Sequence, residues 1–216
     1  MIVDLSVPIE TGMPVYPGDP EVTVSPALTA AADGVNVLRV HLGSQSGTHV
    51  DAPNHIDDSL PGLDALPLDR FFGPATVADV RGLPPGAAIG PESLAPALRP
   101  GHILLIATGW SDYWGTGHYL SHPHLTAEAA RLIVGSGVRT VAIDALSVDP
   151  TPPDEKGEFL PAHRVLCGAH AVIAENLRNL GTVLAERPDG PFEVSLLPLR
   201  LAGAADGAPV RAVARL

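Results

Sequence analysis

The sequence predicts an α/β protein, with one domain over residues 1–216 and a mixed β-sheet or barrel-like core flanked by a few helices. The strongest observation is a continuous apolar run within 101–110, which is typical of a strand buried on both faces. A helical segment and a second apolar run at 138–143 follow, and this succession favours two parallel strands joined by a crossover helix. The 23 prolines and 22 glycines are scattered between apolar runs, which indicates many tight loops.

Short strands are predicted in the first part of the chain. Residues 2–7 alternate between apolar and polar, and 22–26 and 35–43 are expected to pair as strands that lead into the next segment. Residues 12–20 form a stiff loop rich in proline and glycine. In this loop, Tyr16 is either part of a pocket wall or an aromatic side chain packed on the core.

The remaining elements follow in order along the chain. We predict a strand at 75–80, a helix at 91–98 and a helix from the N-cap Thr126 to about 134. A polar loop at 150–157 and a short helix at 161–168 follow. The last predicted elements are strands at 169–174, 181–184, 192–200 and 210–216. No repeat, linker or change of composition divides the chain, so we expect a single domain.

The stretch 45–55, Gln-Ser-Gly-Thr-His-Val-Asp-Ala-Pro-Asn-His, holds the densest group of candidate ligands. Its glycine and proline disfavour a helix, so we predict a strand that runs out into a loop. Alternate residues of a strand share a face, which places His49 and Asp51 about 6.5 Å apart at their Cα atoms, close enough to bind one metal ion. Gln45 shares this face, and Gly47 is expected to leave room for an ion, a water or a substrate. The alternative is a buried His–Asp pair near a turn.

This stretch resembles the motif His-x-Gly-Thr-His-x-Asp-x-Pro-x-His of the cyclase family of metal-dependent hydrolases, which includes bacterial kynurenine formamidases. The matching residues are Gly47, Thr48, His49, Asp51, Pro53 and His55. Gln45 stands where the family has its first histidine. The resemblance covers nearly the whole chain, with further matches over 122–149 and in the Asn-Leu-x-Asn-Leu segment at 176–180. It implies a fold of the swivelling β/β/α type.

The resemblance also implies four metal ligands, His49, Asp51, His163 and Glu175. Taken alone, His163 and Glu175 would be interpreted as a helix-surface histidine and a solvated carboxylate. Two imidazoles and two carboxylates suit Zn²⁺, Mn²⁺ or Fe²⁺, as one ion or two, with Zn²⁺ or Mn²⁺ as the expected metal. Such an ion lowers the pKa of bound water from about 15.7 to about 7 and polarises a carbonyl, which makes hydrolysis the expected reaction.

Further roles follow from the same resemblance. His55 is expected to be the general acid–base residue and Tyr16 to contact the substrate. Trp110 ends a buried strand in an aromatic cluster, which either lines the pocket or packs within a surface loop. The implied substrate is a formamide, a cyclic amide or a lactone, with a kynurenine formamidase-like (arylformamidase) activity as the first expectation.

Gln45 leaves several alternatives open. An amide oxygen is a weaker ligand than an imidazole, so a second ion is weakly bound, absent or a harder cation such as Mn²⁺. Gln45 could instead hydrogen-bond a metal-bound water or the substrate. The alternative functions are a lactone hydrolase such as a dienelactone hydrolase, and a catalytically silent protein that binds a small molecule.

Composition restricts the partners. The 13 Lys and Arg residues against 24 Asp and Glu give a formal charge of −11, and no basic run is present, so nucleic acid and membrane surfaces are not expected partners. The start of the chain has no basic stretch before an apolar one, so no signal peptide is expected. The lone Cys167 fits a reducing compartment, and we expect a cytoplasmic protein. The family resemblance implies a homodimer or homotetramer.

Overall fold

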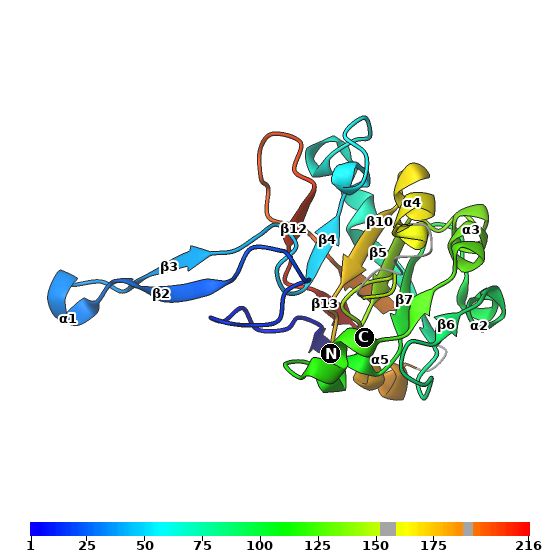
Figure 1. Ribbon diagram of the computed structural model, residues 1–216, viewed down its shortest axis with the longest axis horizontal. Coiled ribbons are helices and arrows are strands. Elements are labelled where there is room, and N and C mark those ends of the chain that lie inside the picture. The colour runs from blue at the N-terminus through cyan, green and yellow to red at the C-terminus, as the bar shows by residue number, and fades with distance from the viewer. Residues whose placement is uncertain (152–158, 188–191) are drawn as a thin grey trace.

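A computed structural model describes residues 1–151, 159–187 and 192–216. Its body is built on a nine-stranded mixed sheet, strongly curled into a half-barrel, with helices packed on both faces (Figure 1). The predicted α/β class with a barrel-like sheet and few helices is confirmed. In the described parts of the chain, no helix is long and apolar enough to cross a membrane.

The central strands of the sheet are parallel and the outer ones antiparallel. In sheet order the strands are β1 (Ile2–Asp4), β13 (Val213–Arg215), β11 (Phe192–Ser195), β5 (Phe72–Asp79), β7 (Ile103–Ala107), β9 (Thr140–Ile143), β10 (Val172–Glu175), β4 (His49–Asp51) and β12 (Gly207–Pro209). The run from β5 through β7 and β9 to β10 is parallel, whereas β4 pairs antiparallel with both β10 and β12. The predicted parallel pair of strands joined by a crossover helix is therefore confirmed as β7 and β9.

Side chains of β7 alternate between two hydrophobic clusters, which explains its continuous apolar sequence. Leu104 and Ile106 belong to the cluster that includes buried residues of α3 (Ala127–Gly135) and α4 (Pro161–Gly168). Leu105 belongs to the second cluster, which includes buried residues of α5 (Leu180–Glu186). Helices thus cover the two faces of the same strand. The short α2 (Pro91–Leu94) also contributes to the first cluster, and the two-residue strands β6 (Ala88–Ile89) and β8 (His124–Leu125) pair outside the main sheet.

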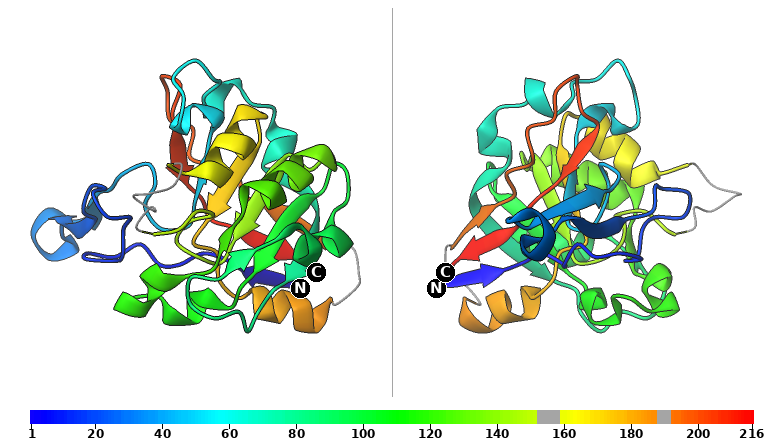
Figure 2. Two further views of the ribbon diagram at one scale, coloured as in Figure 1. Left: turned by 45° about the vertical axis from the view of Figure 1, so that its right-hand side comes forward. Right: turned by 90° about the vertical axis from the view of Figure 1, so that its left-hand side faces the viewer.

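An arm projects from the body (Figures 1 and 2). It consists of the antiparallel pair β2 (Thr23–Leu28) and β3 (Val37–His41), with α1 (Ala30–Asp33) at its tip. This confirms the predicted pairing of these two segments. Pro26 lies opposite Leu38, and Val24 opposite Val40, so apolar side chains share one face of the arm. Leu38 and Val40 are 62% and 51% exposed on this face, whereas Val24 packs against the buried cluster of Val7, Met13 and Val22.

One predicted element is wrong. Residues 181–184 were expected to form a strand, but they lie in α5. Leu180 and Val183 are spaced by three residues and both are buried against the sheet, so a helical period explains their apolar character better than a strand. The predicted loop at 150–157 lies mostly outside the described residues.

Candidate metal centre and active site

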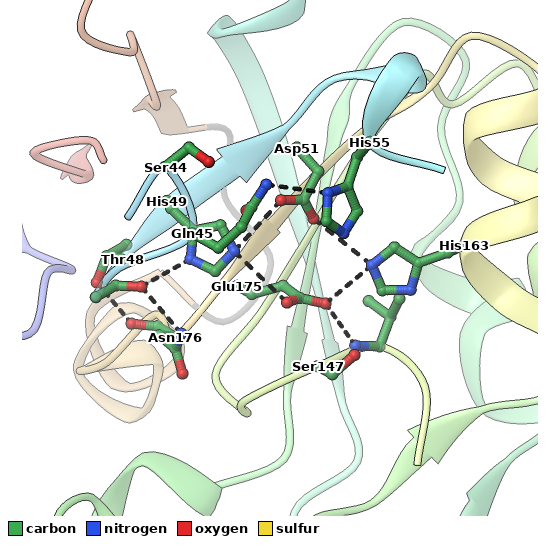
Figure 3. A network of polar contacts seen from close by, with 12 residues as sticks. Ser44, Gln45, Thr48, His49, Asp51, His55, Ser147, His163, Glu175 and Asn176 are labelled. Carbon is green, nitrogen blue, oxygen red and sulfur yellow. Dashed lines mark hydrogen bonds and ion pairs between the residues drawn. The ribbon is translucent and has the colours of Figure 1, made fainter. Parts of the chain in front are cut away.

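Two adjacent strands place three candidate ligands on one face of the sheet. In the register of β4 and β10, His49 lies directly opposite Glu175, and Asp51 lies two residues further along β4. Residues two apart on a strand point to the same side, so the three side chains converge. The fourth candidate, His163, comes from α4, which packs beside β10. His49 and Asp51 lie more than a hundred residues before His163 and Glu175, so the two pairs meet only when the sheet and helix have assembled (Figure 3).

The four side chains form a closed ring of contacts, which we call the donor cluster: His49, Asp51, His163 and Glu175. His49 Nε2 lies 3.3 Å from Asp51 Oδ1 and 3.7 Å from Glu175 Oε2. His163 Nε2 lies 3.6 Å from both Asp51 Oδ2 and Glu175 Oε1. All four residues are buried. These distances show that the two imidazoles and the two carboxylates converge, as predicted from the sequence.

Both imidazoles are oriented by acceptors on their outer nitrogens. His49 Nδ1 donates to the Gly47 carbonyl oxygen at 2.8 Å, and His163 Nδ1 donates to Asp149 Oδ2 at 2.7 Å. An imidazole whose Nδ1 donates presents Nε2 to the other side. In the neutral form, both rings therefore point an unshared electron pair of Nε2 into the donor cluster, which is the arrangement a metal-binding histidine requires.

Without a cation, the four residues of the donor cluster shift one another's pKa values. Burial alone would lower the pKa of His49, but the adjacent Asp51 carboxylate raises it to about 9. Burial likewise opposes protonation of His163, yet its hydrogen bond to Asp149 and the contact with Asp51 raise its pKa to about 10. Burial and the nearby charge of Asp51 raise the pKa of Glu175. Burial would also raise the pKa of Asp51, but the adjacent imidazoles of His49 and His163 hold it well below its usual range.

The residues present fit a divalent cation. Both carboxylate oxygens of Asp51 are buried and accept no hydrogen bond from the residues that the structure describes. A buried carboxylate is costly unless positive charge lies beside it, and a cation supplies this charge when the two imidazoles are neutral. One ligand atom each from His49, Asp51 and Glu175 can be chosen so that all three lie within 4.8 Å of one another. With His163 on the same ring of contacts, these oxygens and nitrogens are ligands that suit Zn²⁺ or Mn²⁺.

A cavity of about 380 Å³ opens onto the donor cluster. Its lining includes the four clustered residues together with Tyr16, Asp19, Gln45, His55, Phe159 and Arg164. The Tyr16 hydroxyl is buried and has no hydrogen-bond partner among the described residues. The volume suits a small organic molecule.

The other predicted site residues fall into two groups. Gln45, His55 and Tyr16 line the cavity, as expected. Trp110 does not line it in the described part of the chain, because its ring is buried in the hydrophobic core and its Nε1 donates to the Tyr119 carbonyl at 3.2 Å. Trp110 is therefore a core residue, and its predicted contact with the substrate is not supported.

The expected role of Gly47 is also corrected. A Cβ atom at Gly47 would lie 2.7 Å from Ile9 Cδ1, so the missing side chain makes room for the core and not for an ion. Gly47 has φ +66, a conformation that favours glycine. This turn directs the carbonyl of Gly47 toward His49 Nδ1 and Asn176 Nδ2, and so helps to orient a candidate ligand.

Three supporting residues were missed in the sequence. Asp149 orients His163 and also accepts the backbone N–H groups of Ala162 and His163 at the start of α4. Asp206 accepts hydrogen bonds from Ser44 and Gln45. Asn176 holds the turn before β4. Asp149 ends a segment after a buried strand, which could have marked it, whereas Asp206 has no local signal because its partners lie about 160 residues away.

Comparisons with known proteins show the family to which the chain belongs. The Cyclase family model matches residues 3–150. The kynurenine formamidase of Salinibacter ruber is 34% identical over 99% of this chain and 97% of its own length. These relatives define the protein as a hydrolase. The chain belongs to the cyclase family.

Solved structures share the fold along the whole chain. A potential metal-dependent hydrolase with cyclase activity is 27% identical, covers 99% of this chain and 96% of its own, and superposes with a TM-score of 0.78. Isatin hydrolase A from Ralstonia solanacearum has a TM-score of 0.88 at 21% identity, with 99% of this chain and 91% of its own covered. An isatin hydrolase bound to thioisatinate has a TM-score of 0.85 at 21% identity, with 100% of this chain and 92% of its own covered. At such identities, the isatin hydrolases support the fold alone.

Proposed function

We propose that this protein is a metal-dependent amide hydrolase that acts on a formamide, with a kynurenine formamidase-like (arylformamidase) activity. The observation that carries this proposal is that the donor cluster lines a cavity sized for a small molecule. The similarity to the kynurenine formamidase of Salinibacter ruber supports the choice of a formamide over other carbonyl substrates.

His49, Asp51, His163 and Glu175 are proposed to hold one divalent ion, Zn²⁺ or Mn²⁺. Such an ion, when bound, supplies a nucleophilic water at neutral pH and polarises a carbonyl. Glu175 is positioned by the backbone N–H of Val148, which donates to Oε1 at 2.8 Å. This contact fixes one end of the carboxylate, so the other oxygen is directed toward His49.

The chain supplies the remaining contacts of the reaction. His55 lines the cavity beside the donor cluster, with its ring centroid 5.8 Å from that of His163, and is placed to exchange a hydrogen bond or a proton with the substrate. The hydroxyl of Tyr16, which is buried and has no hydrogen-bond partner among the residues that the structure describes, is a candidate contact for a polar group of the substrate. Phe159 and Ile56 provide apolar wall.

The test combines metal analysis with a substrate panel. Protein purified without added metal is expected to contain bound ion, to lose hydrolysis of an aryl formamide such as N-formylkynurenine on chelation and to regain it when Zn²⁺ or Mn²⁺ is restored. A dienelactone and a cyclic amide are assayed beside the formamide. Faster turnover of the lactone would favour the lactone hydrolase that the sequence left open, and activity unaffected by chelation would remove the metal from the proposal.

The variant Asp51→Asn has the largest expected effect on the reaction. It removes a shared neighbour of both imidazoles, so the metal content is expected to fall and kcat/KM to drop by about 10³-fold or more, which corresponds to roughly 4 kcal/mol. The matched control is Asp79→Asn, since Asp79 pairs with Arg81 on the surface and a change there is expected to leave both quantities unchanged. Equal losses in both variants would count against a metal site at Asp51.

We also propose that residues 1–216 form one hydrolase domain, that the protein assembles as a homodimer or homotetramer, and that it works in the cytoplasm. The projecting arm supports assembly, because an isolated two-stranded hairpin is marginally stable in water and this one carries exposed apolar side chains. The buried, free Cys167 supports a reducing compartment.

A further inference from the structure

Gln45 occupies a position between the cavity histidine and an acidic residue of another segment. Its Nε2 lies 3.1 Å from His55 Nδ1 (Figure 3). The same Nε2 lies 3.0 Å from Asp206 Oδ2. Ser44 Oγ donates to the same oxygen of Asp206 at 3.0 Å. A methyl group at Gly207 would lie 2.5 Å from Gln45 Nε2, so the backbone of β12 confines the carboxamide from the other side.

Asp206 determines which way the carboxamide of Gln45 points. An ionised carboxylate only accepts hydrogen bonds, so the Gln45 atom beside it must be the nitrogen. The reversed orientation would bring Gln45 Oε1 against Asp206 Oδ2, which places two acceptors in contact. Gln45 Oε1 has no hydrogen-bond partner among the described residues, so no competing donor there favours the reversal.

The orientation of Gln45 in turn determines the tautomer of His55. The –NH₂ group has two hydrogens, of which one is directed to Asp206 and the other is available to His55 Nδ1. A nitrogen that accepts this hydrogen bond carries no hydrogen, so the neutral ring carries its hydrogen on Nε2. Asp206 Oδ2 lies 3.6 Å from His55 Nδ1, which is too long for a direct hydrogen bond that would reverse this preference.

We propose that Gln45 is a positioning residue, which holds His55 in the Nε2–H tautomer so that His55 donates a hydrogen bond to the substrate carbonyl oxygen and does not act first as a base. This inference rests on the proposed hydrolase function, and it specifies that His55 acts as a hydrogen-bond donor. A neutral imidazole that donates to a carbonyl oxygen stabilises the negative charge that develops there. The proposal also means that Gln45 interacts with His55 and is not a metal ligand.

The test reads the tautomer directly in the zinc-loaded protein. Long-range ¹H–¹⁵N correlation spectra of protein with ¹⁵N-labelled histidine distinguish protonated from unprotonated ring nitrogens, and the signals of His55 are those absent from His55→Asn. Nδ1 of His55 is expected to be unprotonated and Nε2 protonated. In Gln45→Glu, a carboxylate faces Nδ1, so the hydrogen is expected to move to Nδ1. A wild-type ring protonated on Nδ1, or a tautomer unchanged in Gln45→Glu, would overturn the proposal.

Two further variants separate positioning from general disturbance. Asp206→Asn allows the carboxamide to reverse and is expected to give a mixture of tautomers even where Gln45→Glu folds poorly. Ser44→Ala removes the other hydrogen bond to Asp206 without touching His55, and is expected to keep the wild-type tautomer. At equal metal content, Gln45→Glu is expected to lower kcat about 100-fold with little change in KM. The tautomer is measured without turnover, so the hydrolysis assays decide the proposed function separately.

Discussion

Histidine has opposite hydrogen-bonding roles in two parts of the cavity. One part is the donor cluster, and the other is the His55 edge, which consists of His55, Gln45 and Asp206. His49 and His163 have acceptors beside Nδ1, a backbone carbonyl and the Asp149 carboxylate. His55 has a donor beside Nδ1, the carboxamide of Gln45. A neighbour on the outer nitrogen therefore decides whether the inner nitrogen offers an electron pair to a cation or a hydrogen to a substrate.

The two regions also differ in their contact with solvent. The side chains of His49 and His163 are each 4% exposed, whereas those of His55 and Asp206 are 27% and 46% exposed. Burial of the donor cluster makes its charges interact strongly, and exposure at the His55 edge leaves room for a substrate to approach. Changes at the cluster are expected to act on metal binding, and changes at the edge on turnover.

Proton competition should produce the largest effect. His49 and His163 in the metal-free protein have pKa values of about 9 and about 10, above the unfolded value of about 6.5. Metal binding must displace both protons, so the apparent affinity is expected to rise about 100-fold per pH unit between pH 7.5 and 8.5, above the pKa of about 7 of Glu175. Competition with a chromophoric chelator at several pH values measures this slope.

The same shifts give the sign of the effect on stability. Imidazoles whose folded pKa is raised stabilise the metal-free fold fully below pH 6.5, and this contribution is lost as the pH rises through about 9 and about 10. Metal-free protein is therefore expected to lose stability as the pH rises, over the same range in which the protein binds the metal most tightly. An affinity that does not depend on pH would contradict the protonated state assigned to these two histidines.

Removal of the acceptor beside His163 should produce the next largest effect. Asp149→Asn weakens the orientation of the ring, and loss of such a supporting carboxylate is expected to lower metal affinity 10- to 100-fold. Asp206→Asn is the matched control from the other region, and its metal affinity is expected to match that of wild type. Equal affinities for Asp149→Asn and wild type, measured by the same chelator competition, would show that the ring is held by packing alone.

A histidine away from both regions should produce the smallest effect. Burial lowers the pKa of His122 to about 4, and its Nε2 lies 3.0 Å from Thr151 Oγ1. The folded state therefore binds a proton less readily than the unfolded state, and stability is lost as the pH falls from 6.5 toward 4. Between pH 7 and 5.5 the expected loss is about 1 kcal/mol. Chemical denaturation of His122→Gln over this range should show a smaller pH dependence than wild type.

The local part of the site could be predicted from the sequence, and the distant part could not. Strand alternation alone places His49 and Asp51 on one face. The convergence of His163 and Glu175 came from the family resemblance, because no local pattern reports the register of β4 against β10. The arrangement around Gln45 depends on Asp206, which approaches through the pairing of β12 with β4. The buried parallel strands were evident from their apolar runs. The prediction of a strand at 181–184 was wrong, because a helix of seven residues has too few turns for its pattern of apolar residues to be recognised.

The direct pairing of His49 with Glu175 has a consequence for folding. These residues are brought together by antiparallel contact between β4 and β10, whose sequence separation exceeds one hundred residues. Closing so long a loop is slow relative to local structure formation. Uptake of a cation during refolding would then report on closure of the sheet, so the rate at which a refolding chain captures its ion would measure the pairing of β4 with β10.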